Sequence, residues 1–410
     1  MDAVSNDQRG FNYLAGAVGF AVVFIITTAL WYVLMHPNGT MKLYTPMYGF
    51  SLVVVFLSCV VLMTRVWGVS LSSEHRCRYS SALLKGLGLT FAAFILTLFV
   101  YYVVFRGFIG NYGVAYFSPD AIVASGGTGA EPYNARENSS TAIIYFAAAF
   151  LWWAIAWNTA FGRWPWTSST KGVIAWSRLT TVLVLSIVTF AVMFHPHVCY
   201  LFYPAQNKAG VEAWWGAFAG TGSAYFGLGL ILSATAWMVI SDILWDRRPW
   251  RSLAKTGDNG FASGAAAIVG TTVLGCITCF VLLKVMTMFW MEPFEGGQYT
   301  DAPYFRYLHA GEISGFVILA AFIQSVYFNG FPNVESGWLK GLFRTLVSFL
   351  GGGLIYWFYY SPAATYILGK VPGIAQPDDT PLVWTLLFLS VIMVHADFFG
   401  GIPLYRKVEE

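Results

Sequence analysis

Two oppositely charged residues lie within long apolar segments, where an ionisable side chain is a candidate for function. Lys284 lies inside the segment 262–290, and Glu312 lies near the start of the segment 309–330. A charge in the interior of a bilayer is costly unless it has a partner or reaches the headgroups. Both residues are expected at a similar depth, so a Lys284–Glu312 pair that contacts a substrate is one hypothesis. The alternative is that Lys284 extends to the headgroups and Glu312 benefits from a helix N-terminus.

Four of the six histidines fall at one predicted face of the protein. The densest group of potential ligands is His195-Pro-His197-Val-Cys199. Neutral imidazoles bind copper, zinc or iron, and imidazoles that face each other from different helices can hold a haem. One hypothesis is therefore a metal or haem site at this face. The alternative is that each His-Pro pair ends a helix among polar headgroups. The candidate ligands are His36, His195, His197 and His309.

Aromatic residues beside small ones mark the segment 212–244 as a second candidate binding region. Trp214, Trp215 and Tyr225 flank a run of glycines that begins at Gly216. The aromatic rings are candidate walls of a substrate site, whereas the glycines would equally allow another helix to approach closely. Gly351–Gly353 in the segment 338–360 also allow two interpretations. The glycines weaken the helix and expose its backbone to a ligand, or they allow close helix packing.

The CxxC spacing of Cys276 and Cys279 is not expected to do redox chemistry. Both cysteines fall in the middle of the segment 262–290. A thiol buried in apolar surroundings resists ionisation, and small polarisable side chains pack well between helices. We interpret the pair as packing residues.

The elements that must position these side chains are predicted to be membrane-spanning helices. Of the 410 residues, 57% are hydrophobic and 10% are charged, whereas a soluble domain carries about 25% charge. A helix needs roughly 20 mostly apolar residues to cross the hydrocarbon core. The sequence thus predicts an all-α polytopic membrane protein with about ten transmembrane helices and a long outer loop at 108–140. The ten apolar segments are 11–35, 44–66, 82–107, 141–162, 173–194, 212–244, 262–290, 309–330, 338–360 and 382–400.

The basic residues between these segments are unevenly distributed. Sixteen of the 23 lysines and arginines fall in the termini and in alternate connections, and six fall in the other connections. The positive-inside rule then predicts cytoplasmic N- and C-termini in the plasma, or cell inner, membrane. The sequons at Asn38 and Asn138 would lie outside. The net charge of +3 comes without a basic patch, so nucleic acid is not an expected partner.

A repeated pattern follows the ends of alternate helices. Asn158 precedes Pro165 by seven positions, and Asp242 precedes Pro249 by the same number. Weaker copies are Asn329 with Pro332, and Asp397 with Pro403. The pattern predicts five tandem helical hairpins, which differ from the inverted repeats of many transporters. One hypothesis is that Arg178 and Arg344 pair with Asp242 and Asp397 between these hairpins. The favoured alternative is that these charges anchor the helix ends at the cytoplasmic headgroups.

Three function classes fit these features. The favoured one is a small-solute transporter or permease. A second is a membrane subunit of a redox or other multi-protein complex, in contact with lipid and with other subunits or copies of itself. The third is a membrane-embedded, metal-dependent enzyme that uses the outer histidines, and enzyme activity is the less favoured expectation.

Overall fold

Every described element in the computed structural model of the chain is a helix. The structure describes residues 13–43, 48–69, 79–109, 120, 131–162, 164–166, 168–194, 222–253, 260–288, 305–332, 334, 337–369 and 381–401. Within these ranges, nine helices are long and apolar enough to cross a membrane, and a tenth apolar helix, Leu382–Phe398, is shorter. The prediction of a polytopic helical membrane protein with about ten spans is confirmed.

The helices follow the predicted segments closely. Two connections also carry short helices, η6 (Trp250–Leu253) and α14 (Pro362–Leu368). Three of the long helices continue as π-helix: α2 into η1, α3 into η3 and α15 into η9. The long helices are α1 (Tyr13–Leu34), α2 (Tyr48–Val61) with η1 (Leu62–Val66), α3 (Tyr79–Leu98) with η3 (Phe99–Ile109), α6 (Glu131–Ala160), α7 (Lys171–Phe194), α10 (Gly222–Ile243), α11 (Phe261–Met288), α12 (Phe305–Tyr327), α13 (Gly337–Tyr359), and α15 (Pro381–Met393) with η9 (Val394–Phe398).

Two boundaries differ from the expectation. Helix α6 begins at Glu131, so the last part of the segment 108–140, expected as a loop, is helical. Its backbone can continue past the apolar stretch because each turn supplies its own hydrogen bonds. Helix α10 begins at Gly222, and the first part of the predicted segment, 212–221, lies outside the described residues.

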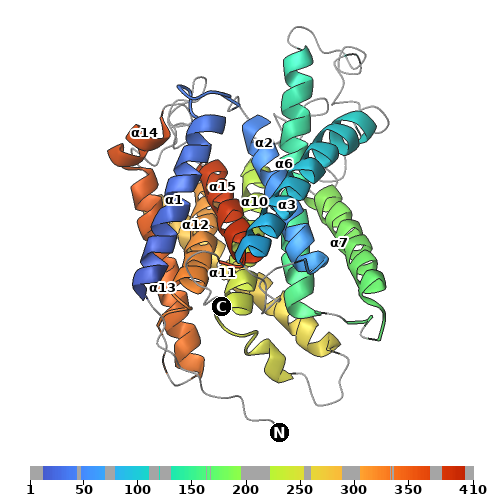
Figure 1. Cartoon of the computed structure of the whole chain (residues 1–410). Coiled ribbons are helices and arrows are strands. Elements are labelled where there is room, and N and C mark those ends of the chain that lie inside the picture. Colours follow the sequence, from blue (N-terminus) through green and yellow to red (C-terminus); the bar gives the residue numbers. More distant parts are fainter. Residues whose placement is uncertain are drawn as a thin grey trace.

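Buried and exposed helices alternate along the chain, and we call them inner and outer helices. The apolar windows of α2 with η1, α6, α10 and α12 are 67–78% buried, whereas those of α1, α3, α7, α11 and α13 are 17–33% buried. Most residues of α15 are also buried. Each hairpin therefore contributes one outer helix followed by one inner helix (Figure 1).

The five inner helices close into a ring. Helix α2 packs against α6, α6 against α10, α10 against α12, α12 against α15, and α15 against α2. Each outer helix packs on the inner helix that precedes it in the chain, and α1 completes the cycle by packing on α15. The outer helices thus pack mainly on the inner helix to which the basic end links them, as α7 does on α6, and less on the second helix of their own predicted hairpin, as α7 does on α10. This arrangement leaves the apolar faces of the outer helices exposed, as a lipid environment requires.

The inner helices end with the same backbone turn. A residue with positive φ follows each helix: Gly68, Gly162, Asp246, Asn329 and Gly400. After α2, α10, α12 and α15, the next N–H donates to a carbonyl six residues back, as Val69 does to Met63 and Arg247 does to Ser241. Such bonds satisfy the carbonyls left over at a helix C-terminus. They also align Asn329 with Asp246 rather than with Asn158, which corrects the weaker match of the sequence repeat.

Among the described residues, the partners of Asp242 are Arg65 and Arg247, and not the hypothesised Arg178 or Arg344. Arg178 on α7 donates to the Gly162 carbonyl at the end of α6. Arg344 on α13 donates to the carbonyl of Leu244, at 3.2 Å, beyond the end of α10. Both arginines therefore bind free carbonyls at helix C-termini, where a cation is also favoured by the helix dipole.

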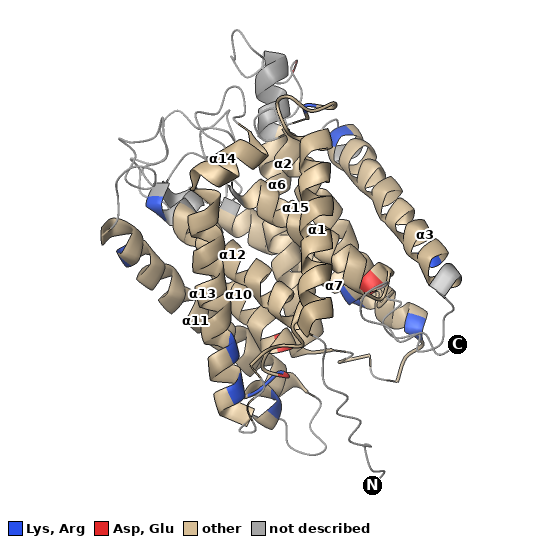
Figure 2. Cartoon of the chain, turned by 60° about the vertical axis from the view of Figure 1, so that its left-hand side comes forward, with Lys and Arg blue, Asp and Glu red and all other residues tan. Residues whose placement is uncertain are grey.

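Positive charge gathers at one end of the bundle. Figure 2 shows most described lysines and arginines at the end where the inner helices finish, which we call the basic end. Other described basic residues, among them Lys42, Arg106, Lys284 and Arg306, lie toward the opposite end. The residues of the basic end are Arg65, Lys85, Lys171, Arg178, Arg247, Arg248, Arg251, Lys340 and Arg344.

The triple glycine of α13 belongs to a helix contact. Helix α13 runs unbroken from Gly337 to Tyr359. A Cβ atom at Gly352 would lie 2.7 Å from the Val317 side chain and 2.9 Å from its Cα, whereas a Cβ at Gly353 would meet nothing within 4 Å. Close packing of α13 on α12 therefore accounts for Gly352.

This difference predicts opposite effects of two adjacent substitutions. Gly352→Ala should lower the free energy of unfolding by about 1–3 kcal/mol, because the new methyl group forces α12 and α13 apart. Gly353→Ala should instead be neutral or raise it by up to about 1 kcal/mol, through helix propensity. Thermal midpoints in detergent measure both. Equal midpoints for the two variants would contradict the contact.

Candidate functional site

A cavity of about 70 Å³ lies on the axis of the inner ring. All five inner helices line it, among them Leu57 of α2, Ala148 of α6, Leu232 of α10, Phe322 of α12 and Leu389 of α15. Most lining groups are aliphatic or aromatic. The cavity is thus an apolar space shielded from lipid by the ring itself.

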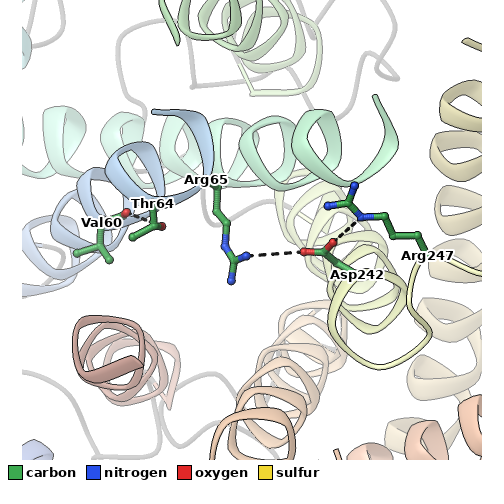
Figure 3. A network of polar contacts seen from close by, with 5 residues as sticks. All are labelled: Val60, Thr64, Arg65, Asp242 and Arg247. Carbon is green, nitrogen blue, oxygen red and sulfur yellow. Dashed lines mark hydrogen bonds and ion pairs between the residues drawn. The ribbon is translucent and has the colours of Figure 1, made fainter. Parts of the chain in front are cut away.

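Polar groups gather where this cavity meets the basic end. Arg65, Asn158, Thr159 and Asp242 line it there, from η1, α6 and α10. An Arg65 Nη1 atom lies 3.9 Å from Oδ2 of Asp242, and Arg247 Nε donates to Oδ1 of Asp242 at 3.1 Å. Figure 3 shows Arg65 extended toward Asp242, with Arg247 on the far side of the carboxylate. Because η1 and α10 are not neighbours in the ring, the Arg65–Asp242 pair crosses its basic end.

The local backbone positions these charges. Thr64, beside Arg65, donates its hydroxyl to the Val60 carbonyl at 2.8 Å, which keeps that side chain on its own helix (Figure 3). After α10, Asp246 and Arg247 both have positive φ, at 53° and 63°. The chain reverses there, and the Arg247 side chain returns to Asp242.

Two of the polar groups, Thr159 and Arg65, keep unused hydrogen-bonding capacity within the described part of the chain. The Thr159 hydroxyl makes no hydrogen bond there, although Thr159 is only 4% exposed. The Arg65 guanidinium contacts Asp242 at 3.9 Å, which is longer than a hydrogen bond. A buried polar group without a partner is costly, so this end of the cavity is suited to a polar ligand.

A second buried polar cluster lies between α12 and the end of α13. His309 Nδ1 lies 2.5 Å from Oε2 of Glu312, and both side chains are 1% exposed. The Tyr360 hydroxyl oxygen lies 3.2 Å from Nδ1 of His309. His309, Glu312 and Phe316 share the face of α12 that packs on α13, where Phe316 contacts Tyr356. The cluster therefore faces α13 and not the cavity.

Lys284 and Glu312 form no ion pair in the part of the chain that the structure describes. Lys284 is exposed on α11. Among the described residues, the side chain of Glu312 hydrogen-bonds to His309. Of the proposed aromatic walls, Trp214 and Trp215 lie outside the described residues, and the side chain of Tyr225 does as well.

His36 has a structural role at the end of α1. Its Nδ1 accepts the backbone N–H of Asn38 at 3.0 Å, and a Cβ at Gly369 would lie 2.3 Å from its Nε2. Burial lowers the pKa of the imidazole, which favours its neutral form. These contacts fit the interpretation of His-Pro as a helix end.

Of the four candidate metal ligands, the structure describes His36 and His309. Within the described ranges, no three His, Cys, Asp or Glu residues are grouped closely enough to hold a metal ion. His195 and His197 lie outside those ranges. Cys279 is buried and Cys276 is partly buried, both as free thiols, in keeping with packing residues.

Sequence reasoning treated Asn158 and Asp242 as marks of the repeat and did not place them at a site. Arg65 is one of the sixteen basic residues that set the predicted orientation, and it lies at the end of the long apolar segment 44–66. The spacing His309-Ala-Gly-Glu312 puts both side chains on one helix face and would have indicated that pair.

Comparisons with protein-family models, with curated proteins and with solved structures give no match for this chain. The fold and the cavity define it as a multi-pass helical membrane protein with a ring of five buried helices around an axial cavity.

Proposed function

We propose that the protein is a small-solute transporter whose pathway runs along the axis of the inner ring. The observation that carries this proposal is the cavity enclosed by all five inner helices. Substrate sites of membrane transporters lie between helices, away from lipid, and ionisable groups mark the pathway. The Arg65–Asp242 pair occupies that position here.

Charged residues lie at the polar end of the cavity, and the neighbouring helices α10 and α12 pack closely on the opposite side. At the basic end, Arg65 is 29% and Arg247 43% exposed. On the opposite side, Ser233 of α10 and Ser314 of α12 share a hydrogen bond of 2.9 Å, and a Cβ at Gly311 would lie 2.9 Å from the Gly229 Cα. Transport then requires that this contact opens while the basic end closes. The proposed cycle places the basic end in the cytoplasm of a plasma membrane, as the distribution of basic residues predicts.

A plug in the cavity tests the proposal. Purified protein in vesicles of neutral and anionic phospholipid would be assayed for uptake of a panel of radiolabelled organic anions, cations and neutral metabolites. Ala148 is 8% exposed and lines the cavity, so Ala148→Phe should reduce uptake at least about tenfold by filling the path. Val269→Phe, at an exposed position of α11, adds the same bulk facing lipid and should leave uptake unchanged.

Uptake that both variants retain would overturn the axial pathway. No uptake of any solute above that of protein-free vesicles would overturn transport. Thermal midpoints of both variants, measured in parallel, identify a loss that is due to misfolding.

A further inference from the structure

We propose that the axial cavity is a binding site for a short-chain monocarboxylate, with its carboxylate at Arg65 and its alkyl chain in the apolar part. This inference names the solute class of the proposed transporter. It rests on that proposed function only in so far as the bound carboxylate is also transported. The binding step itself does not depend on transport.

The charge at the polar end of the cavity favours an anion. Asp242 carries one negative charge and lies between two cations, Arg65 and Arg247. The carboxylate is therefore already neutralised, and the group as a whole has a formal charge of +1. An incoming ammonium group would meet two guanidinium groups near the only carboxylate of the lining, and like charges at short range repel strongly where the surroundings are partly desolvated.

The available donors match a carboxylate head. Arginine presents donors in a planar fork that binds a carboxylate through two parallel hydrogen bonds. The fork of Arg65 is only 3.9 Å from Asp242, a separation that leaves room for a closer anion to compete. Thr159 adds a buried hydroxyl that has no partner among the described residues, and Asn158 adds an amide group to the same lining. Together they can satisfy both oxygens of one carboxylate.

The remaining space limits the rest of the molecule to a short alkyl chain. The cavity of about 70 Å³ is roughly half of an engineered cavity of about 150 Å³ that holds benzene. Two or three carbon atoms beyond the carboxylate fill such a volume. The surrounding Leu57, Leu232 and Phe322 offer no hydrogen bond, so hydroxylated or doubly charged acids would lose hydration without compensation.

Binding in this position also explains why Arg65 spans the ring. A carboxylate that takes the Arg65 fork competes with Asp242, and so weakens the only described ion pair between η1 and α10. The ligand would loosen the contact across the basic end that the substrate-free state maintains. Such a differential contact is what a ligand needs in order to shift a conformational equilibrium.

The test is equilibrium binding to the full-length protein in detergent, by calorimetry and by the shift of the thermal midpoint. The probes are acetate, propionate, butyrate and hexanoate, with propionamide and propylammonium as neutral and cationic analogues of the same size. We expect propionate or butyrate to bind most tightly, and the other four probes at least about tenfold more weakly, because each lacks either the charge or the fit. Preference for propylammonium, or affinity that rises steadily to hexanoate, would overturn the assignment.

Variants locate the binding site. Arg65→Gln removes the charge, and Arg65→Lys retains it without the fork; we expect no detectable propionate binding for the first and about tenfold weaker binding for the second. Ala148→Leu fills the apolar part and should also remove binding. Arg251→Gln, at an exposed position of the basic end, is the matched control and should bind as the unmodified protein does. Propionate affinity that is unchanged in Arg65→Gln and in Ala148→Leu would place the carboxylate elsewhere and overturn the proposal.

Binding and transport can fail separately. Propionate binding that depends on Arg65, without uptake into vesicles, would leave the site intact and overturn the transporter. Uptake of another solute that Ala148→Phe blocks, without carboxylate binding, would leave the transporter and overturn the site.

Discussion

Replacing Glu312 by alanine is expected to lower the free energy of unfolding by about 3–5 kcal/mol, because removal of one member of a buried pair leaves the other without its partner. His309 and Glu312 are both 1% exposed, and their atoms lie 2.5 Å apart. Thermal or denaturant unfolding in detergent measures the loss. We expect it to be the largest effect of any single substitution discussed here.

Glu312→Gln is the matched control for this prediction. The amide keeps the size of the side chain and an oxygen that can accept a hydrogen bond from His309, so it should recover roughly half of the loss. Lys284→Ala, at an exposed position of α11, should change stability by less than about 0.5 kcal/mol. A large loss in Lys284→Ala would instead restore the pairing of Lys284 with Glu312.

Asp242→Ala is expected to lower the free energy of unfolding by about 2–4 kcal/mol. The side chain of Asp242 is 11% exposed between Arg65 and Arg247, and without it the two guanidinium groups repel each other. The expected loss is smaller than for Glu312→Ala because Arg247 is 43% exposed and water screens its charge.

A second substitution should partly restore the stability of Asp242→Ala. Arg65→Gln in that background removes one of the two cations, so the double variant should be more stable than the sum of the single effects by about 1–2 kcal/mol. Asp246→Asn is the control: Asp246 is exposed and has positive φ, a conformation that asparagine tolerates. Additive effects of the two substitutions would contradict the ion pair across the ring.

The repeat at the helix ends was predictable because it depends on local chemistry. Pro165 and Pro249 follow Asn158 and Asp242 at equal spacing, and the turns before them satisfy carbonyls that any helix leaves free. The register of the weaker copies was not predictable. Asn329 occupies the positive-φ position after its helix, as Asp246 does after α10, and not the position of Asp242 near the helix end. Asparagine and aspartate are suited to either position.

The partners of charged residues depended on contacts far apart in the chain. Arg178 and Arg344 looked like partners for Asp242, but they bind the carbonyls near Gly162 and Leu244. Asp242 instead meets Arg65, which lies 177 positions earlier (242 − 65). Spacing along one helix can indicate His309 with Glu312, whereas no spacing links Arg65 with Asp242.

The sequence by itself determined that the chain folds as about ten lipid-crossing helices in tandem hairpins, because length, hydropathy and helix-end chemistry are local properties. Only the tertiary structure decided which helices form the inner ring. Lipid tails are as apolar as a helix interface, so α1 and α2 have the same mean hydropathy of 2.2 although 22% of one window is buried and 72% of the other. The axial cavity exists only once the five inner helices have closed on one another, and its residues come from five separate segments.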